Sequence, residues 1–205
     1  MKPYNPLEKE NLGKSVAESL LNSSPIPLGK LKTFSGAGIY AIYDTGDFPT
    51  SFPLTKLNAS PQELKAPIYV GKAIPTGGRK GVIDPEISAK GQKLYKRLDE
   101  HRKSIDDATN LKIEDFWFRN LVVDDVWIPL GESLIIQHYH PLWNLVVDGF
   151  GNHNPGSGRF AGKRSSWDTI HPGRSWAEQC APSKLTEDEI LEQISKFWVA
   201  NGYVR

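Results

Sequence analysis

Two short stretches decide the fold of this chain: Gly36–Asp44 (GAGIYAIYD) and Ala66–Ala73 (APIYVGKA). Both are rich in aliphatic and aromatic residues, and glycines interrupt both, as is typical of β-strands. The segment between them, Gly46–Pro67, contains four prolines and is predicted to be a long connection. The two stretches therefore predict neighbouring strands of a small sheet.

The chain beyond these strands alternates between helical and extended patterns. Apolar residues recur near helical spacing directly after the glycine-rich region, and a run rich in aromatic and β-branched residues follows. In chain order, we predict a helix over Lys93–Ser104, a strand over Phe116–Val123, a helix over Gly131–Tyr139 that His140-Pro141 stops, and a short strand over Trp143–Val147. This order predicts an α/β (α+β) protein with a small mixed or antiparallel sheet flanked by helices.

The core of residues 36–147 is expected to carry two extensions. Residues 1–35 form an N-terminal arm with a short helix over Lys14–Leu21. Residues 148–205 form a loop-rich C-terminal extension, irregular over Gly149–Arg174 and helical over Leu185–Val199. At 205 residues, the whole chain is expected to form a single structural domain.

The last predicted helix has a clear start and a clear buried side. Thr186 and Glu189 have the spacing of a capping box. Leu191, Ile194 and Trp198 are expected to form its buried stripe.

Composition excludes several classes of protein. Cys180 is the single cysteine, so no intramolecular disulfide can form, which fits a reducing compartment. No apolar run approaches the ~18 residues of a membrane span. The first residues, MKPYNPLEKENLGK, lack the apolar core of a signal peptide. We therefore expect a cytoplasmic protein with no membrane partner.

The net charge of +1 conceals two basic stretches. Nine Lys and Arg residues stand against four acids between Lys72 and Lys103, and four stand against one acid between Arg159 and Arg174. Two separate basic regions indicate a polyanionic partner such as nucleic acid. A solvated basic surface is the alternative.

Several residues could carry acid–base or phosphate chemistry. Tyr40 and Tyr69 lie on the two predicted strands, and Lys72 follows closely as a cation able to lower a tyrosine pKa. Cross-strand packing is the alternative role for the tyrosines. Arg97 and His101 are spaced i, i+4 and so share one helix face, where they suit phosphate binding and proton transfer or simply form a solvated basic face.

Two further residues complete the candidate set. Glu132, near the start of an apolar helix, is either a residue favoured by the helix dipole or a single carboxylate for Mg²⁺. Asn144, beside Trp143, is either a turn residue or an orienting amide.

Taken in order, these residues resemble the GIY-YIG nuclease family. The resemblance rests on GIY at Gly38–Tyr40, YVG at Tyr69–Gly71, Arg97-x-x-x-His101, Glu132 and Asn144, and covers residues 36–147. Two positions depart from the usual pattern. Valine replaces isoleucine in the second motif, and His101 stands where many members have tyrosine, which leaves open whether His101 acts as base, relay or hydrogen-bond donor.

The C-terminal extension is similar to that of the type II restriction branch of this family, the CCGCGG-cutting enzymes. The similarity lies in WNLVVDGFG at residues 143–151, Asn152-His153, Pro155-Gly156, Gly158–Phe160 and WDTIHPGRSWA at residues 167–177. The resemblance implies a sequence-specific, Mg²⁺-dependent endonuclease that cuts duplex DNA at a short palindromic G·C-rich site.

The resemblance also implies roles for individual residues. Glu132 would hold one Mg²⁺ ion per site, and Arg97 would bind a phosphate oxygen. Tyr40 would accept the water proton, assisted by Tyr69, His101 and Lys72, although His101 is an alternative acceptor. Asn144 would orient Tyr40 or Glu132. The DNA-contacting residues would be Asn152, His153, Asn154, Arg159, Lys163, Arg164 and Arg174.

A palindromic site and one copy of each motif imply a homodimer. Candidate interface residues are Leu20, Leu21, Ile26 and Leu28 in the arm, and Phe197 and Trp198 in the last helix. Packing of either segment on the chain's own core is the alternative. Two other functions remain open: a non-catalytic DNA-binding protein, and a structure-specific nicking nuclease of the repair kind.

Overall fold

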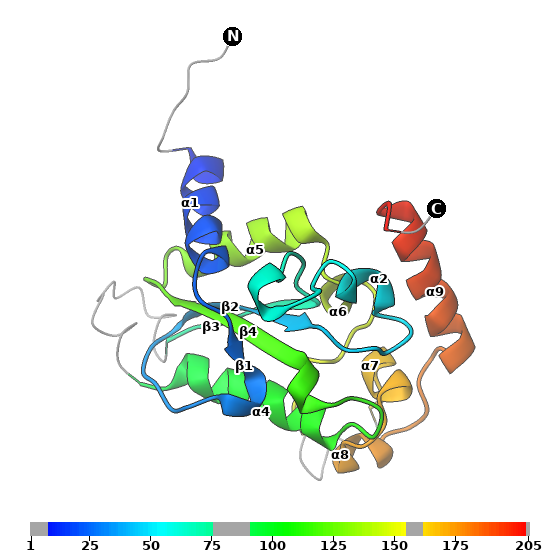
Figure 1. The fold of residues 1–205 in the computed structure, drawn as a ribbon. Coiled ribbons are helices and arrows are strands. Elements are labelled where there is room, and N and C mark those ends of the chain that lie inside the picture. Colours follow the sequence, from blue (N-terminus) through cyan, green and yellow to red (C-terminus); the bar gives the residue numbers. More distant parts are fainter. Residues whose placement is uncertain (1–7, 76–90, 155–161, 204–205) are drawn as a thin grey trace.

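A four-stranded antiparallel sheet forms the centre of the protein, as seen in a computed structural model that describes residues 8–75, 91–154 and 162–203 (Figure 1). The strands are β1 (Ile26–Pro27), β2 (Gly38–Asp44), β3 (Tyr69–Ala73) and β4 (Phe116–Val122), in the spatial order β1-β4-β2-β3. The predicted fold class is confirmed, and the sheet is antiparallel throughout.

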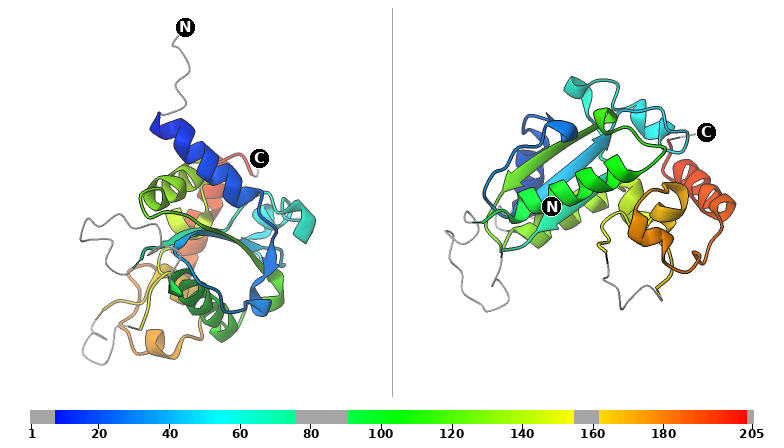
Figure 2. Two further views of the ribbon diagram at one scale, coloured as in Figure 1. Left: turned by 90° about the vertical axis from the view of Figure 1, so that its left-hand side faces the viewer. Right: turned by 90° about the horizontal axis from the view of Figure 1, so that it is seen from below.

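Helices cover both faces of the sheet (Figures 1 and 2). Helices α1 (Lys9–Leu21) and α5 (Ile128–Tyr139) lie on one face, and α4 (Lys93–Asp107) lies on the other. Strand β2 is buried along its whole length because it is covered on both sides. Ile39, Ala41 and Tyr43 pack toward α1 and α5, whereas Tyr40 and Ile42 pack in the core that contains Leu94 and Leu98 of α4.

Apart from helix α9, the remaining elements are short. Helix α2 (Phe52–Thr55) and the 3₁₀ turns η1 (Leu28–Lys30), η2 (Pro61–Glu63) and η4 (Ile113–Asp115) lie in the connections. Helices α6 (Leu142–Leu145), α7 (Ser166–Ile170), α8 (Ser175–Glu178) and α9 (Glu187–Ala200) make up the C-terminal part. In the described ranges, no helix combines the length and apolar character needed to cross a membrane.

The predicted strand over Trp143–Val147 is wrong, because this segment begins with helix α6. Pro141 is the N-cap of α6, and the Trp143 amide donates to the Ile68 carbonyl (3.0 Å) at the outer edge of β3. The segment thus covers the edge of the sheet without extending it. The short strand β1 and helix α7 were not predicted, because each is too short to show a period.

The capping box of α9 is confirmed, with reciprocal hydrogen bonds between Thr186 and Glu189. Its buried residues are Ile190, Ile194 and Trp198, so the predicted Leu191 is displaced by its neighbour Ile190 and is only partly buried. Trp198 packs in the chain's own core, as do Leu20 and Leu28 of the arm. These three residues are therefore not available to a partner subunit.

Candidate active site

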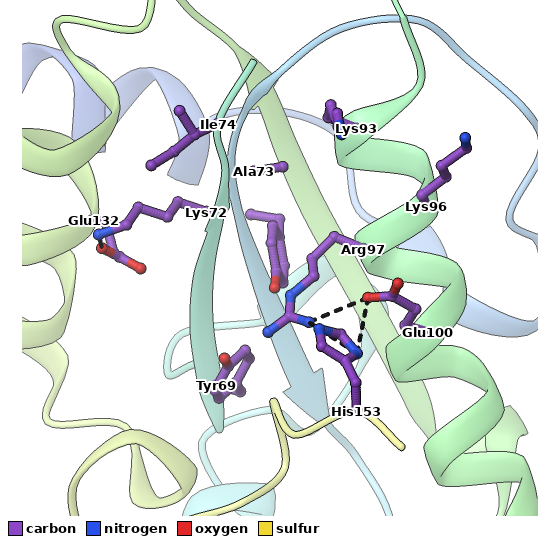
Figure 3. Close-up of a pocket in the computed structure, with 11 residues that line it drawn as sticks. Tyr69, Lys72, Ala73, Ile74, Lys93, Lys96, Arg97, Glu100, Glu132 and His153 are labelled. Carbon is purple, nitrogen blue, oxygen red and sulfur yellow. Dashed lines mark hydrogen bonds and ion pairs between the residues drawn. The ribbon is translucent and has the colours of Figure 1, made fainter. Parts of the chain in front are cut away.

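A cavity of about 520 Å³ opens between β3, α4 and α5 (Figure 3). Its lining residues are Tyr40, Tyr69, Lys72, Ala73, Ile74, Lys93, Lys96, Arg97, Glu100, Glu132 and His153. Five of the seven predicted catalytic residues thus share one cavity. The other two do not line it: His101 contacts the lining residue Tyr40, and Asn144 contacts Val70, between Tyr69 and the rest of strand β3.

The glycine of the second motif makes room for the tyrosine of the first. Tyr40 on β2 is paired in register with Gly71 on β3. A Cβ atom at position 71 would lie 2.3 Å from the Tyr40 hydroxyl oxygen, far inside van der Waals contact. The phenol therefore reaches the cavity by passing over Gly71, which explains on steric grounds why the two motifs occur together.

Tyr40 and His101 form a buried hydrogen-bonded pair. The Tyr40 hydroxyl lies 2.6 Å from Nε2 of His101. Burial raises the pKa of Tyr40 well above its usual value of 10, and the nearby Tyr69 acts in the same direction. Burial also lowers the pKa of His101 well below 6.5, with the charge of Arg97 as a second cause. At neutral pH the phenol is protonated and the imidazole is neutral, so the pair can pass a proton from Tyr40 to His101.

Arg97 projects from α4 into the cavity opposite these rings. Its Nη1 donates to Glu100 Oε2 (3.1 Å), and its Nη2 donates to the Gly151 carbonyl (2.9 Å). His153 also contacts the guanidinium (Figure 3). Burial raises the pKa of Tyr69, which lines the same wall. Arg97 is thus a fixed cation in a site suited to a phosphate oxygen.

Glu132 of α5 and Lys72 of β3 form an ion pair on one side of the cavity (Figure 3). Lys72 Nζ lies 2.5 Å from Glu132 Oε2, and the glutamate side chain is 15% exposed. Among the described residues, no three His, Cys, Asp or Glu side chains gather at one point. A single carboxylate that lines the cavity fits Mg²⁺, which keeps most of its water ligands and takes one or two carboxylates together with substrate phosphate.

Asn144 holds the outer edge of β3. Its Oδ1 accepts from the Val70 amide and its Nδ2 donates to the Val70 carbonyl, both at 2.8 Å. These bonds occupy the place of a neighbouring strand. The Asn144 side chain thus hydrogen-bonds Val70 and not Tyr40 or Glu132. Any effect of Asn144 on Tyr40 or Glu132 passes through strand β3, which carries Tyr69 and Lys72.

The sequence profile of the Eco29kI GIY-YIG domain matches residues 32–198. The chain belongs to this family of GIY-YIG restriction endonucleases. A comparison with curated proteins gives no match. Membership confirms the resemblance deduced from the motifs, and it makes the chain a nuclease whose partner is DNA.

The predicted DNA-contacting residues of this GIY-YIG enzyme occupy different environments. Asn152, His153, Asn154 and Lys163 are exposed. Arg164 is half-buried and donates to the carbonyls of Ala177 (3.2 Å) and Glu178 (3.4 Å). Arg159 lies outside the described residues.

Arg174 does not lie where a DNA contact requires it. Its side chain is only 2% exposed and forms an ion pair with Asp168, with Nε 2.6 Å from Oδ1. A guanidinium in this buried pair cannot reach a base or a phosphate. This prediction is wrong because the sequence does not reveal that Arg174 pairs with the buried Asp168. A basic residue in a glycine-rich segment looks exposed.

Three cavity residues of α4 were not predicted: Lys93, Lys96 and Glu100. Together with Arg97 they follow the spacing i, i+3, i+4 and i+7, which places them on one helix face. That spacing, anchored on Arg97, was the signal available in the sequence.

Proposed function

We propose that this enzyme is a Mg²⁺-dependent type II restriction endonuclease. Its substrate is duplex DNA with a short palindromic G·C-rich site, CCGCGG, which it cuts as a homodimer. The observation that carries the proposal is the cavity itself, where a cationic Arg97, the carboxylate of Glu132 and the buried Tyr40–His101 pair converge. This set can bind a phosphate, hold a metal ion and accept a proton.

The proton pathway follows from the pKa directions. A Tyr40 pKa raised by burial disfavours a resting tyrosinate. Tyr40 therefore accepts the proton of the attacking water as its own proton passes to Nε2 of His101, 2.6 Å away. Tyr69 and Lys72 line the same space and tune this transfer.

The phosphate is held by protein groups on two sides. Arg97 donates to a non-bridging oxygen, where negative charge develops in the transition state. Glu132 would hold a single metal ion, which would supply positive charge to polarise the phosphate and stabilise the leaving 3′ oxygen. Lys93 and Lys96 extend the positive surface along α4 to neighbouring phosphates.

Cleavage of a plasmid that carries a single CCGCGG site tests the proposal. With Mg²⁺ the wild-type chain should linearise this plasmid. It should not cut a plasmid in which the site is altered, and it should not cut either plasmid in the presence of EDTA. Glu132→Gln should bind the cognate duplex and fail to cut. Glu192→Gln is the matched control, because Glu192 also pairs with a lysine (Lys196 Nζ, 2.7 Å) but lies on the exposed surface of α9.

Three results would contradict the proposal. Gel shifts without strand breaks would indicate a DNA-binding protein without catalysis. Breaks at junctions or lesions with no sequence preference would indicate a nicking nuclease of the repair kind. Cleavage that persists in EDTA would show that the reaction does not require a divalent metal ion.

A further inference from the structure

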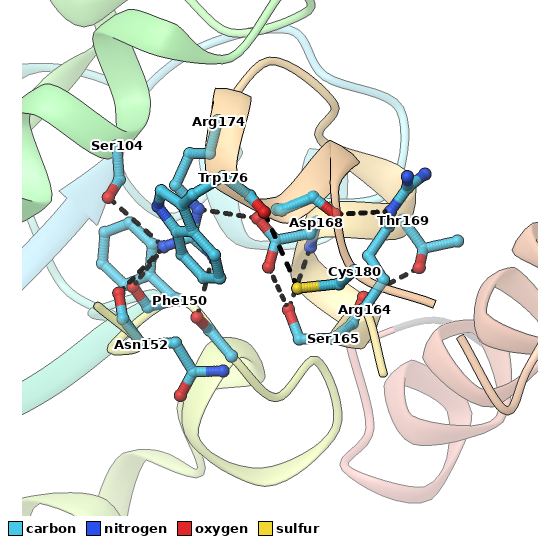
Figure 4. A network of polar contacts seen from close by, with 12 residues as sticks. Ser104, Phe150, Asn152, Arg164, Ser165, Asp168, Thr169, Arg174, Trp176 and Cys180 are labelled. Carbon is cyan, nitrogen blue, oxygen red and sulfur yellow. Dashed lines mark hydrogen bonds and ion pairs between the residues drawn. The ribbon is translucent and has the colours of Figure 1, made fainter. Parts of the chain in front are cut away.

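Arg174 lies at the centre of a buried polar network in the C-terminal part (Figure 4). Its Nε binds Asp168, and its guanidinium carbon lies 4.5 Å from the ring centre of Trp167 and 4.8 Å from that of Trp176. The ion pair and the two indole faces fix the plane of the guanidinium.

The other nitrogens of Arg174 hold the backbone of residues 149–153, which we call the anchored loop. Nη2 donates to the Gly149 carbonyl (3.0 Å), and Nη1 lies within hydrogen-bond distance of the carbonyls of Phe150 (3.3 Å) and Asn152 (3.2 Å). Nη1 also reaches Ser104 Oγ on α4 (3.4 Å). One side chain thus ties the anchored loop to the helix that carries Arg97 and His101.

The anchored loop in turn contacts the candidate catalytic residues. The Phe150 ring stacks on His101, with centroids 4.4 Å apart and an interplanar angle of 19°, and it meets Tyr69 edge-on at 4.9 Å. The Gly151 carbonyl accepts from Arg97 Nη2 (2.9 Å), and His153 contacts the same guanidinium. Arg174 forms its hydrogen bonds with Asp168, Ser104 and the loop backbone, whereas the loop itself contacts all three of these catalytic candidates.

We propose that Arg174 is a positioning residue that fixes Arg97 for phosphate binding through the anchored loop. The inference rests on the proposed function, because it assigns Arg97 the phosphate contact. Arginine is required at position 174 because its planar fork serves several acceptors at once while stacking on two indoles, whereas a lysine ammonium offers one point charge. Asp168 balances the buried charge, as a buried cation needs.

Arg174→Lys tests the proposal under single-turnover conditions, with enzyme in excess over a cognate duplex and with Mg²⁺ present. We expect the cleavage rate to fall by about 10²-fold, the loss typical of a misplaced catalytic group. Duplex affinity should stay close to that of the wild type, because Arg174 is buried away from DNA. Arg119→Lys is the matched control: Arg119 also donates to carbonyls (Ser23 and Leu64) and stacks on a tyrosine, but it does not line the cavity. It should lower the melting temperature and leave the cleavage rate unchanged.

A double-mutant cycle with Arg97→Ala separates positioning from general loosening of the fold. If Arg174 acts through Arg97, Arg174→Lys should slow cleavage much less in the Arg97→Ala background than in the wild type. Full additivity, or equal rates for Arg174→Lys and Arg119→Lys, would overturn the inference.

Gly151→Ala disturbs the same contact from the other end and keeps the test decisive if Arg174→Lys fails to fold. A Cβ atom at position 151 would lie 2.9 Å from the Tyr69 hydroxyl and 3.0 Å from Arg97 Nη2, both at the ends of side chains that can shift. We expect slower cleavage with near-normal melting, and a wild-type rate for this variant would overturn the inference. A wild-type chain that cuts no duplex would instead overturn the proposed function, and the inference with it.

Discussion

Tyr40 is an ionisable hydroxyl at a position where ionisation is unfavourable. Burial raises its pKa, and the neutral His101 at 2.6 Å is the nearest group able to take its proton. A tyrosine that stays protonated at rest cannot attack or deprotonate prematurely, and it needs a simultaneous transfer to act as a base. The pair therefore favours a relay over a stored tyrosinate.

Arg97→Ala should slow cleavage at saturating duplex by about 10²-fold or more, as for other donors to transition-state charge. Duplex affinity should fall only modestly, because many phosphate contacts remain. Single-turnover rates and equilibrium titrations of the same duplex measure the two effects separately. Arg102→Ala is the control, since Arg102 lies on the same helix but pairs with Asp99 and does not line the cavity. If the variant loses duplex affinity but cuts bound DNA at the wild-type rate, Arg97 contributes to DNA binding and not to catalysis.

At the scale of the element, α4 divides its faces between core and cavity. Leu94, Leu98, His101 and Ile105 are buried, while Lys93, Lys96 and Arg97 line the cavity. Helical periodicity determines both faces at once, so the position of Arg97 fixes the positions of the lysines. We therefore expect the face of α4 that carries Lys93, Lys96 and Arg97 to lie along a DNA strand.

Replacing both Lys93 and Lys96 by alanine should reduce the salt dependence of duplex binding. Each phosphate contact contributes about 0.9 to the slope of log K against log salt, so the slope should fall by about 2. The effect should be the same for cognate and unrelated duplexes, because phosphates carry no sequence. Lys103→Ala is the control, as Lys103 lies on the same helix and pairs with Asp99 outside the cavity. An unchanged slope in the double variant would show that Lys93 and Lys96 of α4 do not contact DNA phosphates.

The sequence predicted the elements whose patterns are local and long enough to read. Strand β2, helix α4 and the capped helix α9 were predicted because their alternation, period or capping residues are contained within each segment. Helix α6 was not, because its strand-forming residues cover a sheet edge that only the tertiary fold provides. The same limit explains Arg174, whose role depends on Asp168 and on carbonyls more than twenty residues away.

The whole molecule should lose stability in mild acid. Burial lowers the pKa of His171 to about 3, and it lowers that of His101 well below 6.5. The unfolded chain binds these protons near pH 6.5 and the folded chain does not, so stability is present above that pH and is lost as the pH falls. For His171 alone the loss at pH 5 is about 2 kcal/mol.

Denaturant unfolding at pH 7.5 and pH 5 measures this loss. Asp44 acts in the opposite direction because burial raises its pKa, so a variant comparison is needed to isolate His171. His171→Phe suits the purpose, since the ring lies among Phe48, Trp143 and Trp167. The variant should lose about 2 kcal/mol less than the wild type between the two pH values. Equal losses in both proteins would show that His171 does not titrate as proposed.

The enzyme is expected to act on its DNA with two-fold symmetry. One cavity holds one Arg97, one Glu132 and one Tyr40–His101 pair. Under the proposed function this set serves a single scissile phosphate. Cutting both strands of a palindrome then requires two cavities related by the two-fold axis of the DNA. Because Leu20, Leu28 and Trp198 are buried in the chain's own core, the duplex itself is expected to bring the subunits together. Sedimentation of Glu132→Ala should show two subunits on one cognate duplex and fewer on a duplex with a half-site. One subunit per cognate duplex, together with a nicked intermediate that persists until rebinding, would rule out the dimer.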